Sequence, residues 1–176
     1  MGRGVRMALG WILGGLVWAL VLSLVLVIWE GRGDLSVANL IDMGQVGLVG
    51  VPAAAPGALV FLGLGLLLFG VMGRTGAPVG AGIFGGLLFL LASGLAWKFG
   101  GGSPLVAALF GLFPIEAFWA QAMDIARADG AVWTWLAVHG LTPLVAGGIG
   151  GGVYDAVAGA VKAARRKGRV RPVNFG

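Results

Sequence analysis

The residues of this chain that could take part in chemistry are few, and most of them fall in its last apolar run. His139, the single histidine, lies inside that run, four residues before Pro143. An ionisable residue within a membrane segment is by default a candidate for a proton relay, a haem ligand or a solute contact. The alternative is a neutral imidazole near the membrane surface, hydrogen-bonded to a neighbouring helix or to water. Bis-histidine haem ligation would need a second chain.

Pro143, Tyr154 and Asp155 are the other candidates in the same run. A proline removes one backbone hydrogen bond, so it frees the carbonyl near His139. This break either lines a solute site or is an ordinary kink. Asp155 either gates or relays protons, or forms a salt link with Lys162, which lies on the same helical face.

Composition and motifs point away from catalysis. The chain has no cysteine, which excludes disulfides, iron–sulfur clusters and thiol chemistry. The sequence contains no pairing of a nucleophile with a base, no P-loop and no dinucleotide fingerprint. Glu116 and Asp124, which share a helical face, are interpreted as the wet side of a surface helix rather than a cation site. We therefore predict no cofactor, no metal and no catalytic residue, and an intramembrane enzyme is the least supported hypothesis.

The chain has the composition of an integral membrane protein. Its 176 residues are 59% hydrophobic and only 11% charged, with a mean hydropathy of +0.98, whereas soluble domains are about 25% charged. The net charge of +5 does not indicate nucleic acid, because half of the basic residues gather at the C-terminus. Such a juxtamembrane cluster is typical of binding to anionic lipid headgroups. Its members are Lys162, Arg165, Arg166, Lys167, Arg169 and Arg171.

Apolar runs predict an all-α membrane protein with four transmembrane helices. A helix needs about 20 apolar residues to cross a bilayer, and suitable runs lie at about 7–28, 54–73, 79–97 and 133–157. Two short helices are predicted at the membrane surface, at about 35–43 and 104–128. Pro52 and Pro56 are expected to end the first of these. For 104–128 a re-entrant half-helix and a full crossing remain open.

The positions of the charges predict the orientation. With four spans, nine of the twelve basic residues fall on the side that holds both termini. Because cytoplasmic loops carry the excess of Lys and Arg, both termini are predicted to be cytoplasmic. The expected organisation is one helical bundle over 1–161 and a basic cytoplasmic tail over 162–176.

Glycine spacing predicts how the helices pack. Small residues four apart let neighbouring helices approach closely in lipid, and such pairs occur in the first, third and fourth spans. The function predicted first is a non-catalytic, glycine-packed subunit of a membrane complex or homo-oligomer, with membrane lipids and further membrane subunits as partners. The alternative is a channel or transporter for a small solute or ion, with its pathway near the last helix. The glycines are Gly10, Gly14, Gly82, Gly86, Gly147, Gly148, Gly151 and Gly152.

Overall fold

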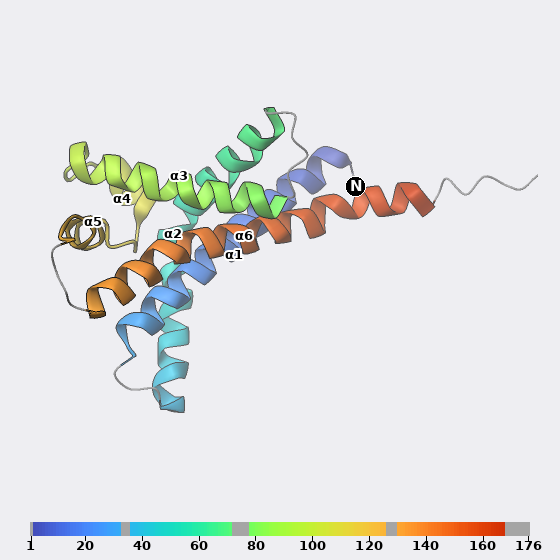
Figure 1. Ribbon diagram of the computed structural model, residues 1–176. Helices are drawn as coiled ribbons and strands as arrows, with labels where there is room; N and C mark the ends of the chain where they lie inside the picture. Colours follow the sequence, from blue (N-terminus) through green and yellow to red (C-terminus); the bar gives the residue numbers. More distant parts are fainter. Residues whose placement is uncertain (1, 33–35, 72–77, 126–129, 168–176) are drawn as a thin grey trace, which may run out of the picture.

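The computed structural model describes residues 2–32, 36–71, 78–125 and 130–167, and these form helices and no strand. Four of the helices are long and apolar enough to cross a membrane, as the sequence predicts. Two shorter helices lie between the third and fourth of them (Figure 1). The elements are α1 (Arg3–Glu30), α2 (Val37–Val71), α3 (Pro78–Phe99), α4 (Pro104–Phe110), α5 (Ile115–Met123) and α6 (Gly130–Lys167).

The first correction concerns α2, which is one helix of 35 residues. The predicted surface helix at 35–43 is wrong as a separate element, since its residues from Val37 onward form the first turns of α2. Pro52 and Pro56 lie inside α2 rather than ending it. Each proline removes one backbone hydrogen bond, but leaving the helix within lipid would expose many more unpaired backbone groups.

The helix α6 lies between α1 and α3 and runs antiparallel to both (Figure 1). Gly14 of α1 faces Gly150, and a Cβ added at either glycine would lie 2.5 or 2.6 Å from the carbonyl oxygen of the other. On the side of α3, Gly82 faces Gly147 in the same reciprocal way. In both helix pairs the two backbones are therefore in direct contact. Any side chain larger than the hydrogen of glycine at these positions would force the helices apart.

These contacts also fix the two ends of the bundle. Gly10 approaches Tyr154, so the start of α1 lies beside the last part of the apolar run of α6. At the opposite end, α1 and α3 finish where α6 begins. We call this the His139 end, because it holds His139.

The second correction concerns 104–128, where no single helix forms. Helices α4 and α5 are bent by 85° relative to each other, and 126–128 lie outside the described residues. The chain leaves α3 and enters α6 at the same end of the bundle, because α3 and α6 are antiparallel. A fifth crossing would have made them parallel. The α4–α5 pair therefore starts and ends at the same end of the bundle, which argues against the full crossing, and we call this pair the re-entrant element.

The bend between α4 and α5, which we call the elbow (Gly111–Pro114), packs against α2 with one side; Phe113 is buried, whereas Gly111 and Leu112 are exposed. Gly111 has a φ of +44° and packs on the backbone of Ala53, while the backbone of Leu109 packs on Gly57. Both contacts require glycine, since a Cβ at Gly57 or Gly111 would overlap a carbonyl of the other segment. The positive φ at Gly111 also favours glycine on conformational grounds.

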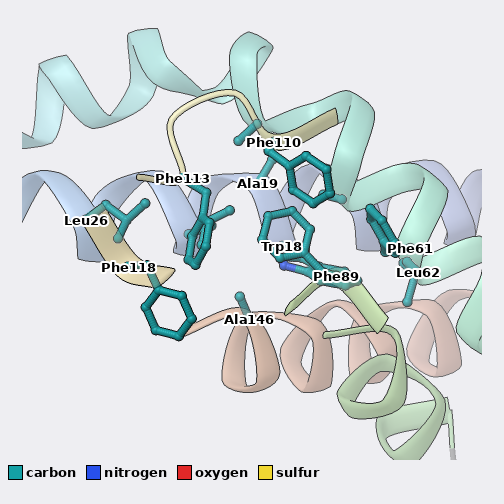
Figure 2. Packing of buried hydrophobic residues seen from close by; sticks show 13 residues of the cluster. Trp18, Ala19, Leu26, Phe61, Leu62, Phe89, Phe110, Phe113, Phe118 and Ala146 are labelled. Carbon is teal, nitrogen blue, oxygen red and sulfur yellow. The ribbon is translucent and has the colours of Figure 1, made fainter. Parts of the chain in front are cut away.

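The core of the bundle is a cluster of aromatic rings around Trp18 and Phe89 (Figure 2). Phe110 and Phe113 reach it from the elbow region, with ring centroids 5.0 and 5.3 Å from that of Phe89. Phe118 continues the cluster along α5 through a contact of 5.4 Å with Phe113. The re-entrant element thus supplies side chains to the centre of the protein, not only to its surface.

Candidate functional site

His139 is the buried ionisable residue at the centre of the candidate site. Its side chain is only 1% exposed. Nδ1 lies 2.9 Å from the carbonyl oxygen of Trp135, one turn earlier on α6. Because a carbonyl can only accept, Nδ1 must carry a proton and donate it. The tautomer is therefore fixed by the helix itself, and Nε2 is the nitrogen left to face another group.

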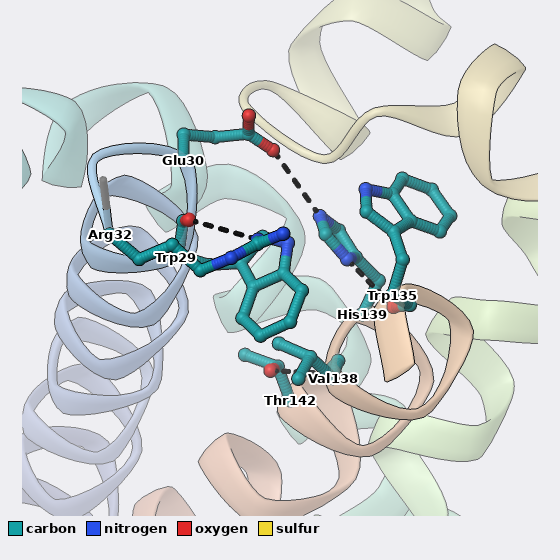
Figure 3. A network of polar contacts seen from close by, with 7 residues as sticks. All are labelled: Trp29, Glu30, Arg32, Trp135, Val138, His139 and Thr142. Carbon is teal, nitrogen blue, oxygen red and sulfur yellow. Dashed lines mark hydrogen bonds and ion pairs between the residues drawn. The ribbon is translucent and has the colours of Figure 1, made fainter. Parts of the chain in front are cut away.

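The group that Nε2 faces is the carboxylate of Glu30, the last residue of α1 (Figure 3). The distance from Nε2 to Oε1 is 3.8 Å. Glu30 is 70% exposed whereas His139 is buried, so the pair joins a solvated carboxylate to an enclosed imidazole. It also links α1 to α6 at the His139 end.

Two indole rings flank the imidazole. Trp135 stacks on it, with ring centroids 3.9 Å apart and an interplanar angle of 22°. Trp29 of α1 meets it edge to face at 6.3 Å and 88°. Arg32 in turn lies over the Trp29 ring, 3.8 Å from its centroid, and donates a hydrogen bond to the Trp29 carbonyl. The rings restrict the imidazole to one orientation and leave its Nε2 edge directed at Glu30.

The local structure of α6 at this site follows from Pro143. Pro143 has no N–H, so the carbonyl of His139 loses its partner four residues on. Thr142 Oγ1 donates a hydrogen bond to the carbonyl of Val138 at 2.5 Å. This side-chain hydrogen bond lies beside the backbone hydrogen bond that Pro143 removes. Pro143 itself is fully buried. The site therefore lies on the N-terminal segment of α6, directly before the interruption in its hydrogen bonding.

The structure does not bring the other predicted candidates to this site. Tyr154 is half-buried against Gly10, and Asp155 is exposed. At 1.5 Å per residue, His139 and Asp155 lie about 24 Å apart along α6. They therefore occupy opposite ends of the bundle. Among the basic residues, 162–167 lie in the last turns of α6, and their side chains, like Arg169 and Arg171, are outside what the structure describes.

The re-entrant element carries an open groove apart from the His139 site. This groove, of about 420 Å³, lies in the angle between α4 and α5, and Glu116 supplies its only charged side chain. Glu116 and Asp124 are both exposed, and the described residues contain no group of three or more side chains that could hold a metal ion. The groove is lined by Val106, Ala107, Phe110, Gly111, Phe113, Pro114, Ile115, Glu116 and Ala117.

Sequence reasoning selected His139 but missed its partners. No sequence pattern links Glu30, Arg32, Trp29 or Trp135 to this histidine. A signal was present, because the predicted topology places Glu30 and His139 at the same side of the membrane. This signal is not sufficient to pair the two residues. The face of α6 that contacts α1 is determined by the close approach of Gly14 and Gly150.

Fold and site together define an all-helical, multi-pass membrane protein with four spans, a re-entrant helix pair and one buried histidine. Comparisons with protein families, with curated proteins and with solved structures find no match.

Proposed function

We propose that this chain is a non-catalytic subunit of a membrane complex or homo-oligomer. The observation that carries the proposal is the closed interior around α6. On both sides of α6 the backbone touches the backbone of a neighbouring helix, and the space between the helices is filled by Trp18, Phe61 and Phe89. Such an interior supports a rigid packing unit better than a solute pathway along α6.

The elbow supports the same proposal. Non-helical backbone is tolerated at membrane depth where it lines a water-filled cavity or is buried in protein. Here the elbow is anchored in protein through Phe113, which belongs to the aromatic core together with Phe110 of α4, while Gly111 and Leu112 remain exposed. The backbone of the elbow is also paired internally, with Phe113 N–H donating to the Phe110 carbonyl at 2.8 Å. The re-entrant element therefore completes the bundle rather than opening it.

Partners would meet the protein at the faces of the helices that point outward. On α6 these include Leu141, Val145 and Ile149, which recur every four residues and are 43 to 59% exposed. A stripe of this kind contacts either lipid or another membrane helix. In our proposal both termini are cytoplasmic and the C-terminal basic cluster binds anionic lipid headgroups, as the positive-inside rule favours.

A small-solute or ion transporter is the second candidate. The contact of His139 with Glu30 favours it, because paired ionisable residues within membrane proteins often belong to ion and proton pathways. Under this alternative the pathway starts at the His139 end. It would need α1 and α6 to separate, since the described conformation is closed there.

Two experiments distinguish these functions. Co-purification in mild detergent tests the first, for which we expect a stable assembly with other membrane subunits or with further copies; a monomer without partners contradicts it. Uptake of a solute panel into proteoliposomes tests the second, with His139→Ala as the site variant and Asp155→Asn as a comparison at the far end. Uptake that is lost in His139→Ala and retained in Asp155→Asn would establish transport and refute the subunit proposal.

A further inference from the structure

The contact between His139 and Glu30 has a chemical property that holds under either proposed function. Nδ1 is committed as a donor to the Trp135 carbonyl at 2.9 Å. The ring can thus change its protonation only at Nε2, the atom that faces Glu30 at 3.8 Å. Without a proton on Nε2, a nitrogen lone pair would face a carboxylate, which is repulsive. With one, the same geometry is an ion pair.

We propose that His139 and Glu30 form a binding site for a single proton, held on Nε2 of the imidazole and stabilised by the Glu30 carboxylate. The proton belongs on the ring rather than on the carboxyl group because Glu30 is largely exposed to solvent. Proton binding joins the end of α1 to the segment of α6 that precedes Pro143.

The enclosure of the ring makes the site selective for a proton. Trp135 covers one face of the imidazole at 3.9 Å and Trp29 stands edge-on at 6.3 Å. Both ring nitrogens are directed at groups of the protein, and the side chain is 1% exposed. A proton reaches Nε2 through the exposed carboxylate of Glu30, whereas a larger ligand would have to displace an indole.

The other charges around the ring define the expected pH response. Burial of the ring is the largest influence on His139 and disfavours the imidazolium; the Trp135 carbonyl and the Glu30 carboxylate favour it, and the Arg32 guanidinium opposes it. Between Gly130 and Tyr154 α6 carries no other ionisable residue. The ionisable side chains on the other helices that contact α6 are exposed, and within the described residues of this end they are Asp42, Lys98, Glu116 and Asp124.

The site can be observed directly because His139 is the only histidine. Protein labelled with ¹⁵N-histidine in detergent micelles gives one pair of imidazole nitrogen signals, which can be followed by NMR as pH is raised. We expect Nε2 to lose a proton in one step while Nδ1 stays protonated throughout. A neutral ring that carries its proton on Nε2 instead would overturn the proposal.

Substitution of the carboxylate tests its part. In Glu30→Gln the midpoint of the Nε2 titration should fall by about one pH unit or more, as expected for loss of an opposite charge at this distance. Glu30→Asp, which withdraws the carboxylate by one methylene, should give a smaller fall, and Arg32→Gln should shift the midpoint upward. Glu116→Gln removes an exposed carboxylate from the same end and should leave it unchanged.

The outcome is independent of whether the protein proves to be a subunit or a transporter. Equal midpoints in the wild type and Glu30→Gln would overturn the proposal, provided that both proteins have the same helical circular dichroism. An equal fall in Glu30→Gln and Glu116→Gln would also overturn it, since the shift would then reflect net charge rather than the pair. Position 30 is exposed, so the variant is expected to fold.

Discussion

Replacing Gly147 with alanine should separate α6 from α3. A Cβ at this position would lie 3.0 Å from the carbonyl carbon of Gly82 and closer still to its oxygen. Carbon atoms pack best at about 3.5–4.0 Å, and the oxygen is nearer than the carbon, so the two helices must move apart by about 1 Å. The atoms in the way are backbone atoms, which cannot rotate aside as a side chain would.

The cost of this separation extends along the whole helix pair. A gap of about 0.5–1 Å removes a quarter to a half of the dispersion energy of each atom pair that it opens. Inserting one methyl group into a well-packed interior typically costs about 1–3 kcal/mol, and we expect Gly147→Ala to lower the free energy of unfolding by that amount. Gly152→Ala is the matched control on the same helix, because its nearest neighbour would be Val79 Cγ2 at an ordinary 3.7 Å.

The assay is reversible unfolding in mixed micelles at increasing sodium dodecyl sulfate, followed by far-ultraviolet circular dichroism. Gly152→Ala should stay within about 0.5 kcal/mol of the wild type, as substitutions away from tight contacts usually do. Gly82 and Gly147 contact each other, so Gly82→Ala and Gly147→Ala disrupt the same contact. The double variant should therefore lose less free energy of unfolding than the two single variants lose in sum. Equal stabilities of Gly147→Ala and Gly152→Ala would refute the claim that backbone contact holds α3 against α6.

Four further substitutions test the packing elsewhere. Ser23→Ala removes the buried hydrogen bond from Ser23 Oγ to the Gly47 carbonyl, at 2.6 Å, and should cost about 1 kcal/mol in the same unfolding assay. Phe113→Ala empties a position among the core rings and should cost about 3–5 kcal/mol; a loss below about 1 kcal/mol would mean that the elbow does not insert. Trp119→Phe and Ser93→Ala each break the hydrogen bond between these two side chains, at 2.9 Å. Each substitution should lower the free energy of unfolding by about 1 kcal/mol. Because both remove the same hydrogen bond, the double variant should be little less stable than either single variant, which a double-mutant cycle measures.

The four spans could be predicted because membrane insertion depends mainly on the length and hydropathy of a run. The first turns of α2 were not, because Pro52 and Pro56 were interpreted with rules that hold for helices in water. In lipid a helix tolerates the hydrogen bonds that a proline removes, because unfolding the helix would leave many more backbone groups unpaired. The position of the elbow could not be predicted, since its packing against α2 depends on Gly57 and Gly111, which contact residues far away in the sequence.

His139 could be predicted as a candidate from its residue type, but the set of residues around it could not. A histidine in an apolar run is conspicuous in any membrane sequence. Its pairing with Glu30 requires that α1 and α6 cross with Gly14 against Gly150, which no local pattern specifies. Asp155 was selected on the same grounds as His139, yet it lies at the far end of the bundle, because proximity along one helix does not imply a shared site.

The elbow has a consequence for biosynthesis. Neither α4, with seven residues, nor α5, with nine, is long enough for a translocation channel to release into the bilayer as a crossing segment. The backbone of Gly111 rests on Ala53 of α2, and Phe113 on Phe89 of α3. Docking of the α4–α5 pair therefore depends on surfaces of α2 and α3, both of which are synthesised before it.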